Sequence, residues 1–184
     1  MHTCMNDRVA WYRTIVYRLG QVRQQLGFVA PLSGEDKQEV QRRLPPSALS
    51  LFDVMSNADK QHSLRVCRGL QERGCFENDM LAAALLHDVG KAQGRVPFWT
   101  RPAIVLGKLC APRLLARLVI TPKLFEQYHV PAWRRALSYA WWHAEVGADL
   151  AAEAGLSERA VLYIRTHHEP NGPAVALHCI DEVS

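Results

Sequence analysis

His87 and Asp88 are adjacent residues that follow the apolar run of residues 78–86, and Lys91 lies shortly after them. Neighbours on a straight α-helix project about 100° apart, so these two side chains can share a target only where the helix stops. Gly90, a residue type that commonly ends helices, predicts such a stop. An imidazole and a carboxylate at a helix end, with a lysine beside them, suit a metal ion that carries a phosphate. An ordinary helix end is the alternative, because the helix dipole favours histidine near a C-terminus.

Further potential ligands occur at separate places, each on a segment whose pattern is helical. They are His62, His143, His167, His168 and Asp181. A single histidine on a helix is more often a surface or hydrogen-bonded core residue than a ligand, and an acid near a chain end is more often exposed. The pair His167-His168 precedes Pro170 and repeats the geometry predicted for His87 and Asp88. The two helix ends could face one site, and a solvated histidine pair is the alternative.

The order and approximate spacing of these residues resemble the HD superfamily of metal-dependent phosphohydrolases. That pattern is a lone histidine, an adjacent His-Asp pair, further histidines and a late aspartate, and the resemblance covers about residues 57–184. The His-Asp pair followed by Val-Gly-Lys, together with His167-His168-Glu169, is most similar to the branch named for its HD and GYP motifs. Residues 171–173 are Asn-Gly-Pro and lack the Gly-Tyr-Pro triplet of that branch.

The resemblance implies an all-α, HD-domain helical bundle that holds one or two divalent metal ions. It implies a first ion held by His62, His87, Asp88 and Asp181, and a second held by His143, His167 and His168, with Asp88 bridging. Imidazoles mixed with carboxylates favour Mn, Fe, Co, Ni or Zn, and Mg fits where oxygen ligands and water dominate. Asp88 and Lys91 are then the catalytic residues, and Lys91 also binds the substrate by neutralising a phosphoryl oxygen. Arg65, one turn after His62, is a further candidate for binding an anionic substrate, although solvated arginines are common.

The length of 184 residues suits one domain with a sizeable core. The predicted organisation is a set of N-terminal helices over residues 1–56 that pack on an HD domain over residues 57–184, with residues 95–142 as an insertion. The five cysteines are scattered and form no Cys-x-x-Cys pair, which indicates reduced thiols in a cytoplasmic protein. Charges near the N-terminus and the shortness of the apolar runs disfavour a signal peptide and a transmembrane helix.

Apolar residues spaced three or four apart predict a helix over residues 8–26. Ser33, followed by two acids, is typical of the start of the next helix. A further helix begins near Ser47 and is predicted to continue through His62 until Gly74 ends it.

A helix over residues 131–154 carries His143 among small residues, which allow another helix to approach closely. Ser157 is predicted to open a helix that ends at His167. The last segment, residues 173–183, is short and has a helical tendency.

Residues 95–142 are basic and rich in tryptophan, with eight lysines or arginines against one acid, Glu126, and four of the five tryptophans. Prolines are predicted to divide this segment into short helices; they are Pro97, Pro102, Pro112, Pro122 and Pro131. The segment could cover an anionic substrate, touch anionic lipid or nucleic acid, or only form a solvated helical subdomain. It joins the His-Asp pair to His143, so it must begin and end beside the proposed site, which favours a lid.

The predicted reaction is metal-dependent hydrolysis of a phosphoester, with a nucleotide or a cyclic (di)nucleotide as the small phosphorylated substrate. Two alternatives stay open at the level of the sequence. One is an HD-type di-iron oxygenase, which uses similar histidine and aspartate ligands, and the other is a non-catalytic regulatory HD module. Guanosine tetraphosphate hydrolases match less well, because their His-Asp pair is typically followed by an acidic pair where this chain has Gly90-Lys91. Peripheral contact with an anionic membrane is the rival use of the basic insertion.

Overall fold

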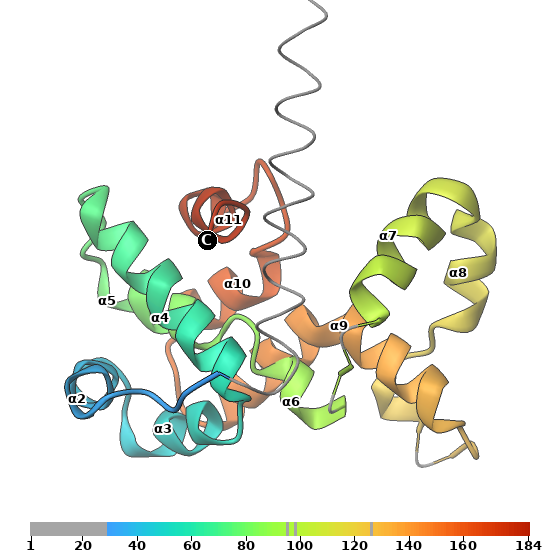
Figure 1. Cartoon of the computed structure of the whole chain (residues 1–184), viewed down its shortest axis with the longest axis horizontal. Helices are drawn as coiled ribbons and strands as arrows, with labels where there is room; N and C mark the ends of the chain where they lie inside the picture. The colour runs from blue at the N-terminus through green and yellow to red at the C-terminus, as the bar shows by residue number, and fades with distance from the viewer. Residues whose placement is uncertain (1–28, 95, 98, 126) are drawn as a thin grey trace, which may run out of the picture. The chain divides into compact units, whose positions relative to one another are not determined.

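A computed structural model describes residues 29–184 except residues 95, 98 and 126 (Figure 1). The chain divides after Pro31 into two units, and the elements below belong to the second, Leu32–Ser184. They are α2 (Gly34–Gln41), α3 (Pro46–Asp53), α4 (Asn57–Glu72), α5 (Asn78–Leu86), α6 (Gly90–Gly94), α7 (Thr100–Cys110), α8 (Pro112–Leu118), the 3-10 helix η1 (Pro122–Leu124), α9 (Ala132–Glu153), α10 (Glu158–Thr166) and α11 (Val175–Asp181). The described part contains no strand, which confirms the all-α prediction for these residues. The helix predicted over residues 8–26 lies outside them.

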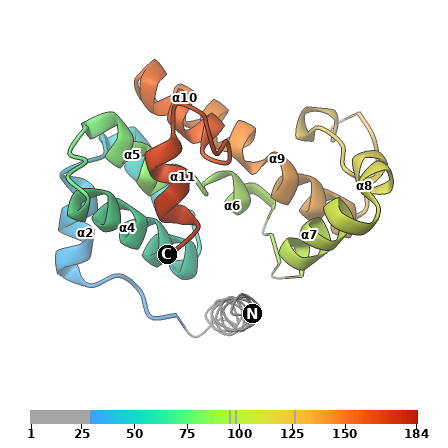
Figure 2. The same cartoon turned by 90° about the horizontal axis from the view of Figure 1, so that it is seen from above.

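Helix α5 lies in the middle of the main core, because every residue from Met80 to Leu86 is buried. A helix that is apolar on all sides can pack against several neighbours at once. Helices α3, α4 and α10 contact α5, α11 contacts α4, and α6 and α10 contact α9 (Figures 1 and 2). Val40, Ala48 and Phe52 belong to the same core, so α2 and α3 pack on the rest of this unit.

Serine side chains begin several of these helices. The hydroxyls of Ser33, Ser56 and Ser157 each accept a hydrogen bond from the backbone amide three residues further on. The helix starts predicted at Ser33 and Ser157 are therefore confirmed. The prediction of one continuous helix leading into His62 is wrong, because α3 ends at Asp53 and Ser56 caps the separate helix α4. Serine stabilises a helix start more than a helix interior, which favours a break at this position.

The helix end predicted before His87 is confirmed, because α5 stops at Leu86. Gly90 is not the cause of this stop, since it is the first residue of the next helix, α6. Its role is to let two backbones meet. A Cβ atom at this position would lie 2.1 Å from the carbonyl oxygen of His143, so α6 and α9 can touch here only because Gly90 has no side chain. Gly74 follows α4 with a φ of 83°, the left-handed conformation that commonly ends a helix.

The basic segment forms a second, smaller core on the first half of α9. Leu115, Val119 and Leu137 are buried together there, and Ile104 and Trp141 pack against them. The segment therefore holds itself together through α7, α8 and α9 rather than through the main core. Its use as a lid over a substrate stays a prediction.

Prolines mark several boundaries in the basic segment. They stand at the start of α8 (Pro112), at the start of η1 (Pro122) and at the N-cap of α9 (Pro131). Pro102 lies inside the first turn of α7 and divides nothing, because a proline there replaces an amide that has no intrahelical partner. Among the described residues, no helix combines the length and the apolar character that crossing a bilayer requires.

Candidate metal centre

The structure brings the histidines and aspartates singled out by the sequence into neighbouring positions. They come from α4 (His62), the end of α5 (His87, Asp88), the middle of α9 (His143), the end of α10 (His167, His168) and the last residue of α11 (Asp181). Two groups have ligand atoms that all lie within 4.8 Å of one another: His62 with His87 and Asp88, and His143 with His167 and His168. The second group has the same residues as the second ligand set that the HD resemblance implies, and the first group holds three of the four residues of the first set.

Asp181 joins the first group from α11. Its Oδ1 atom lies 2.7 Å from Nε2 of His62, which donates a hydrogen bond to it, and 3.4 Å from Nε2 of His87. The Oδ2 atom of Asp88 lies 3.6 Å from the same His87 nitrogen. Two imidazoles and two carboxylates therefore converge on one space.

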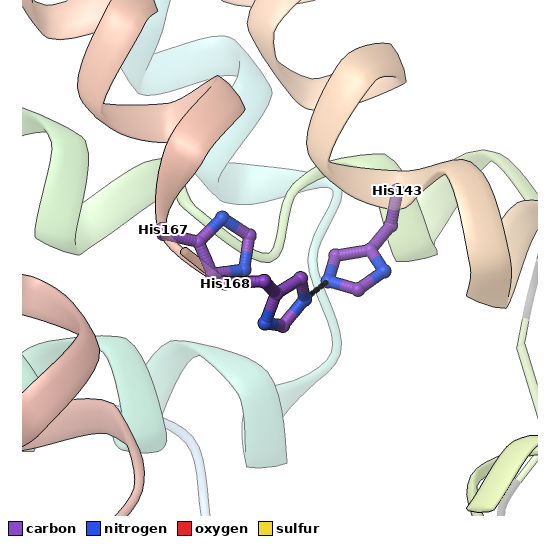
Figure 3. A group of neighbouring side chains, drawn as sticks. All are labelled: His143, His167 and His168. Carbon is purple, nitrogen blue, oxygen red and sulfur yellow. Dashed lines mark hydrogen bonds between the residues drawn. The ribbon is translucent and has the colours of Figure 1, made fainter. Parts of the chain in front are cut away.

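The second group consists of three imidazoles (Figure 3). Nε2 of His168 lies 2.9 Å from Nε2 of His143, and the rings of His167 and His168 have centroids 3.9 Å apart. Asp88 connects the two groups, because its Oδ1 atom lies 3.6 Å from Nε2 of His143. The rings of His87 and His167 also meet edge to face, with centroids 5.1 Å apart. The two groups are thus adjacent parts of one centre.

Three of the histidines are held by the same backbone contact. Nδ1 of His87 lies 2.9 Å from the carbonyl oxygen of Ala84. Nδ1 of His143 lies 2.8 Å from the carbonyl oxygen of Ala140. Nδ1 of His167 lies 2.7 Å from the carbonyl oxygen of Ile164. A carbonyl oxygen can only accept, so Nδ1 carries a proton in each ring and Nε2 is the atom presented to the centre. Metal-binding histidines commonly have this arrangement, because the bond fixes both the tautomer and the orientation of the ring.

The centre contains a buried polar atom that the protein does not satisfy. Among the described residues, Nε2 of His167 has no hydrogen-bond partner, although its side chain is fully buried, and Nε2 of the equally buried His87 meets only the carboxylates of Asp88 and Asp181, at 3.6 and 3.4 Å. Leaving such an atom unpaired costs about 1–3 kcal/mol, so buried nitrogens of this kind usually have a partner. A metal ion would supply it.

The separations between neighbouring ligand atoms also suit a metal ion. Two ligand atoms that each lie about 2.1 Å from an ion are about 3.0–3.4 Å apart, for angles between octahedral and tetrahedral. The separations of 2.7 Å (His62 to Asp181), 2.9 Å (His143 to His168) and 3.4 Å (His87 to Asp181) lie in or close to this range. Small side-chain adjustments would bring each pair onto a common ion.

The electrostatics of the centre differ between the two groups. Burial lowers the pKa of His143 well below its ordinary value, with Lys91 adding to the effect, and burial lowers the pKa of His167 to about 3. Burial alone would also lower the pKa of His87, but the charges of Asp88 and Asp181 outweigh it and raise that pKa to about 9. The second group is therefore ready to donate lone pairs at neutral pH, whereas His87 must first lose a proton.

Lys91 lies at the centre, and Arg65 lies outside it. The Lys91 ammonium forms an ion pair with Oδ1 of Asp88, and only 14% of its side chain is exposed. Arg65 is exposed and lines a cavity of about 380 Å³ between α4 and α11, together with Arg68, Arg73 and Ile180. No hydrogen bond, ion pair or ring contact within the described residues joins Arg65 to the two groups. Its predicted role in binding substrate is not supported by a contact here.

Sequence reasoning predicted that another helix approaches α9 closely beside His143, but it missed that Gly90 on α6 makes this contact with Gly147. It also missed the contribution of His178. Nδ1 of His178 lies 3.1 Å from the carbonyl oxygen of His167 and donates a hydrogen bond to it. This bond ties α11 to the end of α10. The spacing of three residues between His178 and Asp181, which places both on one face of a helix, was the available signal.

No protein-family model, no curated protein and no solved structure matches the chain.

Proposed function

We propose that this protein is a metal-dependent phosphohydrolase of the HD type that acts on a nucleotide or a related phosphoester. The observation that carries the proposal is that Nε2 of His87 and Nε2 of His143 each lie 3.6 Å from a carboxylate oxygen of Asp88. Nδ1 of both rings, and Nδ1 of the neighbouring His167, is tied to its own helix. A histidine that only packs in a core would place both nitrogens on partners inside the protein. Here the bonded nitrogen positions the ring and the other nitrogen faces the centre.

The residues present fit two divalent ions. His62, His87, Asp88 and Asp181 would hold one ion, and His143, His167 and His168 the other, with one carboxylate oxygen of Asp88 facing each group. Divalent ions in this centre would polarise a phosphoryl group and supply a water acidic enough to attack it at neutral pH. The mixed nitrogen and oxygen donors suit Mn, Fe, Co, Ni or Zn better than Mg, which prefers oxygen ligands.

Lys91 supports phosphoester chemistry over other uses of the same ligands. Its ammonium is held beside Asp88, which places a fixed positive charge at the edge of the centre. Such a charge stabilises the phosphoryl oxygens as negative charge builds on them. His168 is exposed while its neighbour His167 is fully buried, so the second group is the side from which an anionic substrate can reach the centre.

Metal analysis combined with a phosphoester screen tests the proposal. The full chain is purified, its metal content is measured by elemental analysis, and turnover is followed with p-nitrophenyl phosphate, bis(p-nitrophenyl) phosphate, mononucleotides and cyclic (di)nucleotides. Asp88→Ala should lose bound metal and turnover, because it removes the carboxylate that faces both groups. Asp53→Ala, which removes an exposed carboxylate on α3, is the matched control and should keep both.

Three results would contradict the proposal. The first is unchanged metal content or turnover in Asp88→Ala while Asp53→Ala behaves as the parent. The second is iron in the purified protein with oxygen consumption and no phosphoester turnover, which would indicate the oxygenase. The third is a protein that binds no divalent ion at all, which would indicate a regulatory module. Circular dichroism of both variants separates loss of the site from loss of the fold.

A further inference from the structure

Helix α7 has apolar residues on two faces, and only one of them is covered. On the covered face Ile104 packs against the small core with Leu115, and a Cβ at Gly107 would lie 2.9 Å from the Leu115 side chain. On the other face the side chains of Leu106 and Leu109 are 60% and 76% exposed. An amphipathic helix that served only to pack would carry polar residues there.

The uncovered face is a continuous stripe. Pro102, Val105, Leu106 and Leu109 follow one another at helical spacing, and all four are exposed. Leu114, near the start of the next helix α8, is also 56% exposed. Scattered exposed apolar residues are ordinary, but several aligned on one surface indicate that something binds there. Residues 102, 105, 106, 109 and 114 are called the apolar stripe below.

The charged residues of the segment that carries the apolar stripe have one sign. Residues 100–125 contain five basic residues and no acid: Arg101, Lys108, Arg113, Arg117 and Lys123. Arg113 and Arg117 are exposed on α8, and the Lys108 ammonium lies 4.8 Å from the ring centre of Trp141. Lys123 is paired with Asp149 at 3.2 Å. The stripe is therefore flanked chiefly by the two α8 arginines and Lys108, which calls for an anionic partner.

The chain's own candidates to cover the stripe do not fit this charge. A second copy bound through the same face would place basic residues opposite basic residues. Residues 1–28 carry an apolar pattern, but they contain four arginines and one aspartate. A nucleic acid fits the charge and not the side chains, because the stripe is aliphatic and has no aromatic ring on which a base could stack. An anionic lipid surface fits both, since it accepts aliphatic side chains and attracts arginine.

We propose that α7 and α8 dock the protein on membranes that contain anionic lipid, with the apolar stripe entering the interface and Arg113 and Arg117 contacting the headgroups. Figures 1 and 2 agree that α7 and α8 lie at the opposite end of the unit from α2 and α3. They also contact α9 through its first half, before His143. Docking through this end needs no metal ion, so it is independent of the proposed function.

Sedimentation with vesicles tests the docking. The full chain should bind vesicles of equal parts phosphatidylcholine and phosphatidylglycerol, and bind much less to phosphatidylcholine alone. Arg113→Gln with Arg117→Gln should weaken binding by roughly 30-fold, because each arginine near an anionic surface contributes about fivefold. Lys37→Gln with Arg42→Gln changes the charge equally on α2 and its C-cap, and should leave binding near the parent value.

The apolar part is tested separately. Leu106→Ser with Leu109→Ser should weaken vesicle binding on the order of 100-fold, because two largely exposed leucines would no longer enter the interface. Val54→Ser with Leu162→Ser, two other exposed apolar residues, is the matched control. If circular dichroism shows that the double leucine variant loses helix, the single Leu109→Ser variant, at the most exposed position of the stripe, carries the test.

Several outcomes would overturn the docking proposal. One is failure of the parent protein to bind the anionic vesicles, and another is equal binding by the parent, the arginine pair and the leucine pair. Binding of duplex DNA or single-stranded RNA that depends on Arg113 and Arg117, without vesicle binding, would identify a nucleic-acid surface. A dimer in analytical ultracentrifugation that Leu106→Ser with Leu109→Ser dissociates would identify a second copy as the occupant.

Discussion

Replacing Gly90 with alanine tests the contact that holds α6 against α9. The added Cβ would lie 2.1 Å from the carbonyl oxygen of His143 and 2.9 Å from the amide nitrogen of Gly147. Both atoms belong to the α9 backbone, so no side-chain rotation can relieve the overlap. Carbon and oxygen atoms approach to about 3.3 Å, so the two helices must separate by roughly 1 Å.

The cost follows from this separation. Overpacking a core typically costs about 1–3 kcal/mol, and a clash between two backbones belongs at the upper end of that range. Alanine gains up to about 1 kcal/mol over glycine as a helix former, which offsets part of the cost. A net loss of about 2–3 kcal/mol lowers Tm by roughly 5–10 °C in a unit of this size.

Thermal unfolding followed by circular dichroism measures the effect. Gly34→Ala is the matched control, because nothing lies within 4 Å of a Cβ at that position, and its Tm should be unchanged or slightly raised. The Gly90 variant should also bind metal more weakly, since the contact includes the His143 backbone and lies two residues from Asp88. A Tm at or above that of the parent protein would refute the close packing of α6 on α9.

Two further predictions concern the centre itself. Lys91→Ala should keep the metal content measured by elemental analysis but lower turnover on the order of 100-fold, because the ammonium that would stabilise the phosphoryl oxygens is lost. Reduced metal content would instead give Lys91 a structural role. Burial lowers the pKa of His87, but the charges of Asp88 and Asp181 outweigh burial and raise this pKa to about 9. Metal binding should therefore release one proton from His87 at neutral pH. The apparent affinity for Zn²⁺ should rise about tenfold between pH 7 and 8. In the metal-free protein, protonated His87 stabilises the fold below its ordinary pKa of 6.5, and this contribution is lost as the pH rises toward 9. Calorimetry in buffers with different ionisation enthalpies counts the protons, and zero release at pH 7 would contradict the assignment to His87.

Local signals account for what the sequence predicted correctly. Ser33 and Ser157 accept their predicted capping bonds, and the apolar run from Met80 to Leu86 before His87 is buried along its whole length. The failures have local causes as well. Ser56 fits equally well inside a polar stretch of a long helix or at a helix start, and only its bond from the Asp59 amide decides between the two. A glycine such as Gly90 looks the same in sequence whether it ends a helix or leaves room for the backbone of another helix.

The convergence of the proposed ligands was predictable only through the pattern of residue types along the whole chain. Single positions carry little information, because each histidine has an ordinary role of its own. Arg65 shows the limit of this reasoning: it lies one turn after His62 on the same helix, yet it lines a separate cavity. A spacing along one helix fixes the direction of a side chain but not the neighbour it meets, which depends on how α4 and α11 pack.

The ordinary role of these histidines and their proposed role in metal binding require the same geometry. The last carbonyls of a helix have no amide partner within the helix, so a histidine at the C-cap can donate Nδ1–H to the carbonyl three residues earlier. His87 and His167 do this at the ends of α5 and α10, and the bond turns Nε2 away from the helix. His143 makes the same bond inside α9, where Gly147 one turn later leaves room for α6. A histidine held in this way presents Nε2 as the proposed metal site requires when a second helix faces it, and the packing of α5, α9 and α10 brings such helices together.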